Sequence, residues 1–351
     1  MGLSKKVKKL AIIDACVDTP EEIILAADLV PHRLFGDPSL PHSAADEHVP
    51  PTHCVWTRNI LEQGLRGLPG DIAGLLSIHG CDCTNRQFDI WLDSVKADFM
   101  YFLNSPLKRN NTALKFFSED LKEFALQLEE YFKVEITDEK LHESIVLMNK
   151  IRETLKTISE FRNKMILKYS ELHELLKLVL TSDKSQALKI CEDKLEELKT
   201  RDSFSESHLK RILLTGSVLD DTSFIKQLEN TGFHIVIDDL CLGTHYFWNT
   251  IEESGDPIKA IAQYHLEKPI YSTKVPSHAR YEYMKTLIDA YSVEGVVNIA
   301  QKFCESVLYD HPFLKTKFKE LNIPYLFVEK EYNREAYKQL STRFDAFAEI
   351  I

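Results

Sequence analysis

The chain has 351 residues, of which 44% are hydrophobic and 28% are charged, and its formal net charge is −11. This composition is typical of a globular protein with two or three domains and argues against a disordered chain. No run of 18 apolar residues and no basic stripe occurs, which argues against a membrane span and against nucleic-acid binding.

Residues 1–109 are predicted to form an N-terminal α/β lobe. The basic start of the chain is followed by only a short apolar stretch that ends at Asp14, so we expect no signal peptide and a cytoplasmic location. Apolar runs predict strands, and helix-start signals with helical periodicity predict helices. The predicted strands are 8–14, 29–35 and 72–78, and the predicted helices are 20–29, 55–66 and 84–94. Residues 36–53 hold four of the 13 prolines, which predicts a long irregular loop.

Residues 110–205 are predicted to form a helical region. Apolar residues recur there at three- and four-residue spacing with Lys and Glu between them, and the only strand-like run is 134–136. An amphipathic pattern requires a buried apolar stripe, whereas the Lys/Glu face is unsuited to a cofactor pocket. We therefore expect this region to pack outside any cofactor site and to contribute to a subunit or activator interface.

Residues 206–351 are predicted to form a C-terminal α/β lobe. The predicted strands are 211–215, 233–237, 295–299 and 325–328, and the predicted helices are 222–231, 280–291 and 312–321. This alternation predicts a parallel sheet with right-handed crossovers. The predicted fold class is therefore α/β, with two Rossmann-like doubly wound parallel-sheet lobes and a helical insert between them.

Four of the seven cysteines share one local setting. Cys54, Cys81, Cys241 and Cys304 each lie near the end of a predicted strand or in a loop before a helix. Because the carboxyl ends of parallel strands face the ligand crevice, these cysteines can meet although they are far apart in sequence. Thiolates are soft ligands that suit iron–sulfur clusters or zinc, and the alternative is that the cysteines are buried packing residues.

The remaining cysteines and the absent motifs argue against several kinds of site. Irregular spacing in a chain expected in a reducing compartment argues against a disulfide framework. Cys191 lies in the Lys/Glu-rich helical pattern and is predicted to be structural, and packing is also the favoured interpretation for Cys16. The segment 81–83 (CDC) lacks the paired two-residue spacing of a zinc ribbon. No P-loop, Gly-x-Gly-x-x-Gly or Gly-x-Ser-x-Gly motif is present, so nucleotide binding through those loops and serine hydrolysis are not expected.

Several separated stretches carry motifs that follow one another in a familiar order. They are 19–27 (TPEEIILAA), 31–36 (PHRLFG), Cys54 with Arg58, 81–82 with 88–91 (CD and FDIW), Gly232 with 238–243 (DDLCLG), 303–304, 312–315 (PFLK), 323–324 and 342–347 (TRFDAF). This ordered set covers nearly the whole chain. It resembles the 2-hydroxyacyl-CoA dehydratase and benzoyl-CoA reductase family, and within it an iron–sulfur subunit of the catalytic component.

The resemblance implies a [4Fe–4S] cluster at the interface of the two lobes. Its implied ligands are Cys54, Cys81 and Cys304, with Cys241 as the reserve candidate. A cluster with three protein thiolates leaves one iron open, so it can act as a Lewis acid as well as an electron carrier. The implied activity is a one-electron reduction of an acyl-CoA thioester, by which a dehydratase expels a hydroxyl group. The implied partners are the acyl-CoA substrate, a second homologous subunit or a second copy of the chain, and an ATP-dependent iron–sulfur activator protein.

Departures from the family pattern leave both the substrate and the dehydratase activity open. Cys83 is an additional thiol, residues 305–306 (ES) replace Asp-Pro, and residues 244–245 (TH) stand where an Arg is common. Ser277 lies where double-cubane relatives tend to have cysteine. The alternative is a double-cubane-type or electron-relay iron–sulfur protein that reduces small molecules without binding acyl-CoA, and the extra thiols of Cys16, Cys83 and Cys241 favour it. A further alternative is a non-catalytic partner whose cysteines are simply buried.

Some polar residues are weaker candidates. Glu47, in the loop before Cys54, is the predicted catalytic base or contact for the substrate hydroxyl, and a solvated loop is the alternative. Asp238 and Asp239 are expected either to orient a loop through backbone N–H groups or to take part in the chemistry. Arg33 and Arg343 are candidates for contact with CoA phosphates, and a salt bridge is the alternative for each.

Overall fold

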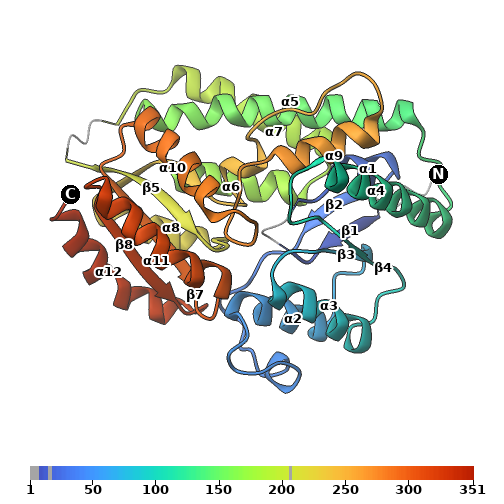
Figure 1. Ribbon diagram of the computed structural model, residues 1–351, viewed down its shortest axis with the longest axis horizontal. Helices are drawn as coiled ribbons and strands as arrows, with labels where there is room; N and C mark the ends of the chain where they lie inside the picture. Colours follow the sequence, from blue (N-terminus) through green and yellow to red (C-terminus); the bar gives the residue numbers. More distant parts are fainter. Residues whose placement is uncertain (1–7, 15–17, 205–207) are drawn as a thin grey trace, which may run out of the picture.

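The computed structural model describes residues 8–14, 18–204 and 208–351, and it contains one four-stranded parallel sheet in each half of the chain (Figure 1). The N-terminal sheet has the order β2-β1-β3-β4. Its strands are β1 (Lys9–Ile12), β2 (Val30–Arg33), β3 (Ile72–Ile78) and β4 (Met100–Leu103). The sequence analysis did not predict β4, because four residues carry too little periodicity to stand out.

The helices of this lobe follow the predicted pattern with shifted ends. They are α1 (Glu21–Ala26), α2 (Val55–Arg66) and α3 (Asp82–Ser94). Helix α1 is shorter than predicted because the chain turns at Asp28, which takes a left-handed conformation (φ 57°). The long loop 36–53 contains one short 3₁₀ turn, η1 (Ala45–Glu47).

The central region is helical, as predicted. It contains α4 (Asn111–Phe132), α5 (Asp138–Asn163), α6 (Tyr169–Thr181) and α7 (Lys184–Thr200). Side chains of Asn110, Thr137 and Asp183 cap three of these helices at their N-termini. The prediction of strand-like structure at 134–136 is wrong: this segment is a linker, tied by the Ile136 N–H to the Glu129 carboxylate at 2.6 Å. Helix α5, green in Figure 1, runs along both lobes.

The C-terminal sheet repeats the order of the first one, as β6-β5-β7-β8. Its strands are β5 (Lys210–Gly216), β6 (Phe233–Asp239), β7 (Gly295–Gln301) and β8 (Tyr325–Lys330). The helices are α8 (Thr222–Glu229), α9 (Pro257–Glu267), α10 (Ser277–Tyr291), α11 (Glu305–Glu320) and α12 (Arg334–Ala348), with the 3₁₀ turn η2 (Thr244–Tyr246).

The prediction for this lobe missed α9 and α12 and placed the start of α11 at residue 312. Proline is favoured in the first turn of a helix, but here Pro312 lies inside α11. The helix continues through it because Val307, Leu314 and Phe318 are fully buried along its length.

The two parallel sheets with flanking helices confirm the predicted α/β fold class. One cluster of buried apolar side chains joins both lobes and the helical region, including Leu75, Leu155 and Leu214, each 0% exposed. The lobes therefore share a core that fixes their relative position, and domain boundaries at 109/110 and 205/206 stay a prediction. Within the described part of the chain, no helix combines the length and the apolar character needed to cross a membrane.

Candidate functional site

Three cysteines lie at the N-terminal ends of three helices. Cys54 is the N-cap residue of α2, Cys81 that of α3 and Cys304 that of α11. Cys81 follows β3 and Cys304 follows β7, so the carboxyl ends of two parallel strands deliver these two thiols. The start of a helix carries a partial positive charge from unpaired backbone N–H groups, and this charge stabilises an anion. All three sulfurs therefore lie where the helix N-terminus contributes a positive potential, although this does not by itself decide which of them loses its proton.

These three cysteines form the common wall of two cavities. The outer cavity has a volume of about 580 Å³ and is also lined by residues 79–83, Ser277 and Tyr309, whose side chain is 82% exposed. The inner cavity has a volume of about 50 Å³ and is also lined by the buried side chains of Thr57 and Asp239. Cys83 lies on the outer side and Cys241 on the inner side. The structure thus brings together thiols from both lobes, as the sequence predicted, whereas ligation itself stays a prediction.

The thiols also interact with one another in pairs. Interaction with Cys54 lowers the pKa of the Cys304 thiol, and the same interaction raises the pKa of Cys54. Interaction with Cys83 lowers the pKa of the Cys81 thiol to about 7, while the pKa of Cys83 is raised. One thiol of each pair therefore loses its proton easily, and the thiolate is the form that binds a metal.

Hydroxyl groups lie beside two of the sulfurs. The Thr84 hydroxyl is 3.6 Å from Cys81 Sγ, and the Ser306 hydroxyl is 3.7 Å from Cys304 Sγ. Both hydroxyls come from the first turn of the helix that the cysteine caps. They are oriented by the same local structure as the thiols and add polar partners for a negatively charged sulfur.

The loop that carries Cys241 is fixed by the two aspartates predicted to act there. Asp238 accepts hydrogen bonds from the Thr244 N–H and hydroxyl, both at 2.8 Å, and pairs with Arg162 at 2.8 Å. A side chain at Gly243 would lie only 1.9 Å from the Asp238 carboxylate, so a glycine is needed at this close approach. Asp238 therefore orients the loop, which is one of the two roles expected for it.

Asp239 belongs to an ionic network on the wall of the inner cavity. Its carboxylate lies 2.7 Å from His245 Nε2 and 2.9 Å from Arg280, and Arg280 also pairs with Asp310. Burial alone would raise the pKa of Asp239, but Arg280 and His245 hold it below the ordinary value. The carboxylate therefore stays charged beside the cavity, and this negative charge is compensated by Arg280.

The structure separates the other candidates from the cysteines. Glu47 is exposed in η1 and is not part of the lining of either cavity, so its catalytic role stays a prediction without structural support. Arg33 is 4% exposed and donates to the backbone carbonyl of Asp14 and to the Thr19 hydroxyl, so it is occupied within the protein. Arg343 is exposed and donates to the Phe327 carbonyl at 2.8 Å.

Cys191 and Cys16 are the two cysteines for which packing is the favoured prediction. Cys191 is 0% exposed on α7 among apolar residues, and burial raises its pKa to about 12, in agreement with its predicted structural role. Cys16 lies outside the described residues.

One segment of the site was missed by the sequence analysis. Tyr271, Ser272 and Thr273, between α9 and α10, line the inner cavity, and the last two also line the outer one. No motif marks them, because a threonine or serine in a loop has no distinctive spacing. Their place depends on distant contacts, such as that of Tyr271 with Asp18, 253 positions away in the sequence.

Among the described residues, no group of three or more His, Cys, Asp and Glu side chains has the spacing to hold a single metal ion. The described side chains that line the two cavities come from the two lobes and from segments outside 110–200. This agrees with the expectation that the helical region packs outside the cysteine site.

The fold and the site define an α/β protein with two parallel-sheet lobes and a cysteine-lined cavity between them. The chain belongs to the family described as 2-hydroxyglutaryl-CoA dehydratase, D-component, which it matches over residues 16–351. Membership confirms the resemblance predicted from the motifs and places the chain in a family of enzyme subunits.

Similar proteins are subunits of two kinds of enzyme. The chain is 24% identical to the (R)-phenyllactyl-CoA dehydratase beta subunit of Clostridium sporogenes, with 95% of this chain and 89% of the relative covered. It is 23% identical to the C subunit of the benzoyl-CoA reductase of Thauera aromatica, again over 95% and 89% of the two chains. It is 22% identical to the beta subunit of the (R)-2-hydroxyglutaryl-CoA dehydratase of Acidaminococcus fermentans, over 95% and 90%.

Proposed function

We propose that this chain is the iron–sulfur subunit of a 2-hydroxyacyl-CoA dehydratase-like or benzoyl-CoA reductase-like enzyme. The observation that carries the proposal is the set of three helix-capping cysteines, Cys54, Cys81 and Cys304, which come from both lobes and line the same two cavities. The relatives' names, which describe subunits of acyl-CoA dehydratases and of benzoyl-CoA reductase, support it.

The donor set fits a [4Fe–4S] cluster better than a single metal ion. All three donors are soft thiols, which suit iron–sulfur clusters. Ligands of one ion must crowd around a single point, whereas ligands of a four-iron cluster bind different iron atoms and lie farther apart. Three helix N-termini around the thiols would balance the negative charge that such a cluster carries.

Particular cysteines of this chain would hold the cluster between the two cavities. Cys54, Cys81 and Cys304 would hold it, with Cys241 as the reserve ligand on the inner side. When bound, the cluster supplies one-electron transfer and, at an iron without a protein ligand, Lewis-acid chemistry. The outer cavity, at about 580 Å³, gives a reactant or a partner access to this wall. The inner cavity, on the opposite side of the wall, has a volume of only about 50 Å³.

The proposal includes an acyl-CoA substrate, a second homologous subunit or a second copy of the chain, and an ATP-dependent iron–sulfur activator as electron donor. The relatives are named as single subunits of dehydratases and of a reductase, which supports the need for a partner subunit. A double-cubane-type electron relay is the second candidate, and the two extra thiols beside the three ligands, Cys83 and Cys241, favour it.

Anaerobic purification with iron and sulfide analysis, together with absorbance near 400 nm, tests the proposal. We expect about four irons per chain for the leading proposal and about eight for the double-cubane alternative. A pure, folded chain that contains no iron after anaerobic expression and reconstitution would refute both.

A further inference from the structure

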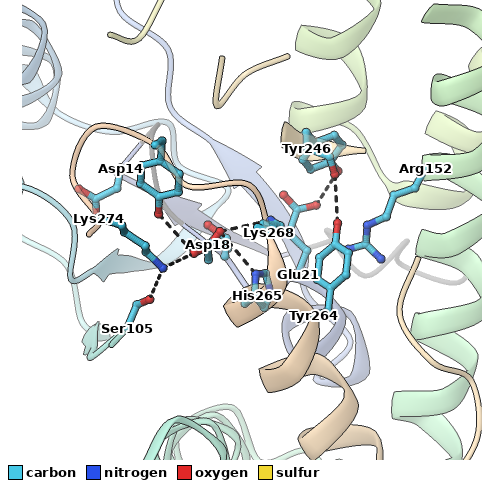
Figure 2. Close-up of polar contacts among 12 residues, drawn as sticks. Asp14, Asp18, Glu21, Ser105, Arg152, Tyr246, Tyr264, His265, Lys268 and Lys274 are labelled. Carbon is cyan, nitrogen blue, oxygen red and sulfur yellow. Dashed lines mark hydrogen bonds and ion pairs between the residues drawn. The ribbon is translucent and has the colours of Figure 1, made fainter. Parts of the chain in front are cut away.

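The loop between α9 and α10, residues 268–276, is anchored by a buried charged cluster (Figure 2). The Asp18 side chain is only 3% exposed, and its carboxylate lies 2.6 Å from Lys274 Nζ and 3.5 Å from Lys268 Nζ. Tyr271 donates its hydroxyl to the same carboxylate at 3.3 Å. Three side chains of one loop therefore converge on one carboxylate of the N-terminal lobe.

This anchor is ionic and costly to break. Burial alone would raise the pKa of Asp18, but Lys274 and Lys268 hold it well below its usual value, so the carboxylate is charged. Lys274 also donates to the Ser105 hydroxyl at 3.2 Å, which ties the loop to the segment after β4. Removing Asp18 or one of the two lysines would leave a buried charge without its partner. These charged side chains therefore fix the loop in one position.

The residues between the two lysine anchors face the cysteines. Ser272 and Thr273 line both the outer and the inner cavity. The Ser272 hydroxyl is 3.4 Å from that of Ser306, which in turn lies 3.7 Å from Cys304 Sγ. A chain of hydroxyl groups thus leads from the anchored loop to one of the proposed ligands.

Thr273 differs from its neighbour because its hydroxyl is unpaired. The oxygen is buried and has no hydrogen-bond partner among the described residues. A buried hydroxyl without a partner is unfavourable, and such groups usually find one in a bound ligand or water. Thr273 lies on the wall that it shares with Cys54, Cys81 and Cys304, so a group held by these thiols would be its neighbour.

We infer that Thr273 donates a hydrogen bond to a sulfur of the cluster and that Asp18 is the positioning residue that holds it there. This inference rests on the proposed function. Hydrogen bonds to cluster sulfurs are one of the factors that set the reduction potential, because they stabilise the more negative, reduced state. Thr273 therefore makes the cluster easier to reduce than the thiol ligands alone would.

The test is an EPR-monitored redox titration of the full chain, reconstituted with iron and sulfide under anaerobic conditions. The variants are Thr273→Val, which keeps the shape but lacks the donor, and Thr273→Ser, which keeps the donor. Thr316→Val is the matched control, since Thr316 is on α11 and its hydroxyl is occupied by the Pro312 carbonyl. We expect equal iron content in all forms and a more negative midpoint potential in Thr273→Val alone.

Asp18→Asn tests the positioning role. It should shift the midpoint in the same direction as Thr273→Val and change the EPR line shape, and the double variant should shift the midpoint by less than the sum. Equal potentials in the wild type and Thr273→Val would overturn the inference, and so would a Thr273→Val chain that loses its iron while Thr273→Ser keeps it. A wild-type chain without iron would instead refute the proposed function itself.

Discussion

The two lobes have the same strand order but contribute differently to the cysteine site. In each lobe the third strand in the sequence, β3 or β7, leads directly to a helix capped by a cysteine, Cys81 or Cys304. In both cases an acidic residue follows, and then Cys83 in one lobe and Ser306 in the other. The repeated topology therefore aims two helix N-termini at one point, where the two lobes meet.

The difference lies in the helix that precedes that strand. In the N-terminal lobe this helix is α2, capped by Cys54, whereas its counterpart in the C-terminal lobe is α10, which is preceded by Pro276 and begins at Ser277. Ser277 lines the outer cavity but has no thiol. Four helix starts thus lie around the site and three of them carry a cysteine, which would leave one position of the proposed four-iron cluster without a protein ligand.

The largest effect is expected from removing one capping cysteine in either lobe. Cys54→Ser and Cys304→Ser should each abolish the cluster and activity together, because serine is a harder and less acidic donor than cysteine. Iron analysis and activity assays of the purified variants measure this. Cys191→Ser is the control and should keep both, with a loss of stability of roughly 1 kcal/mol.

Cys241→Ser, made in parallel, decides between the two candidates for the third ligand. We expect it to keep its iron, since Cys241 lines the inner cavity but not the outer one. Full iron content in Cys304→Ser together with its loss in Cys241→Ser would reverse the assignment. Full iron and turnover in Cys54→Ser would show that the proposed site is wrong.

A second difference between the lobes is the residue at which the first strand ends, which is Ile12 for β1 and a glycine for β5. Strand β5 ends at Gly216, which has φ 137° and leaves only 2.0 Å between an added Cβ and the Ile299 carbonyl oxygen. We expect Gly216→Ala to destabilise the chain by about 2–4 kcal/mol, because strain and a backbone clash add. Urea unfolding measures the change.

The control for this prediction is Gly232→Ala. Gly232 also has a positive φ of 90°, but an added Cβ would meet nothing within 4 Å. It should cost only about 1 kcal/mol, from backbone strain alone. Similar losses in both variants would show that the contact with Ile299 is relieved by a small shift.

The lobe comparison also shows which parts of this protein its sequence could predict. Long apolar runs such as β3 and β7, and the residues that follow them, predicted both sheets and the meeting of Cys81 and Cys304. The local sequence pattern did not predict β4, which is only four residues long. It also gave the wrong start for α11, because Pro312 inside this helix resembles the proline that is common in a first helical turn. It also could not find Thr273, because that residue is placed by charges from the other end of the chain.

The loops after the first strand of the two lobes are held by side chains that differ in how their charge depends on pH. In the N-terminal lobe Arg33 donates to Asp14 and Thr19, and arginine stays charged at every relevant pH. In the C-terminal lobe the loop after β5 contacts His173 of α6, which bonds to the Leu219 carbonyl at 2.9 Å and to the Thr222 hydroxyl at 2.8 Å. Burial lowers the pKa of His173 to about 4. The C-terminal loop therefore depends on a neutral histidine.

The sign of the pH effect follows from proton binding. Between about pH 4 and pH 6.5 the unfolded chain binds a proton at His173 and the folded chain does not, so the free energy of unfolding rises with pH across this window. Acidification from pH 6.5 to 4 should remove roughly 3 kcal/mol through this group. His173→Asn should flatten that part of the pH dependence in urea unfolding, and an unchanged slope would contradict the assignment.

The smallest effect is expected from the residue that distinguishes the two equivalent helix starts, Cys83 against Ser306. Cys83 is the main cause of the lowered pKa of Cys81, about 7, so Cys83→Ala should raise the pKa of Cys81 toward its usual value. At pH 7 this leaves less thiolate, and alkylation of Cys81 in the iron-free chain should slow several-fold. Iodoacetamide kinetics across pH, with the labelled peptide identified by mass spectrometry, measure the shift.

Ser306→Ala is the matched control in the other lobe and should leave the pKa of Cys81 unchanged. An unaltered pH profile in Cys83→Ala would mean that the N-terminus of α3, rather than the neighbouring thiol, sets the acidity of Cys81.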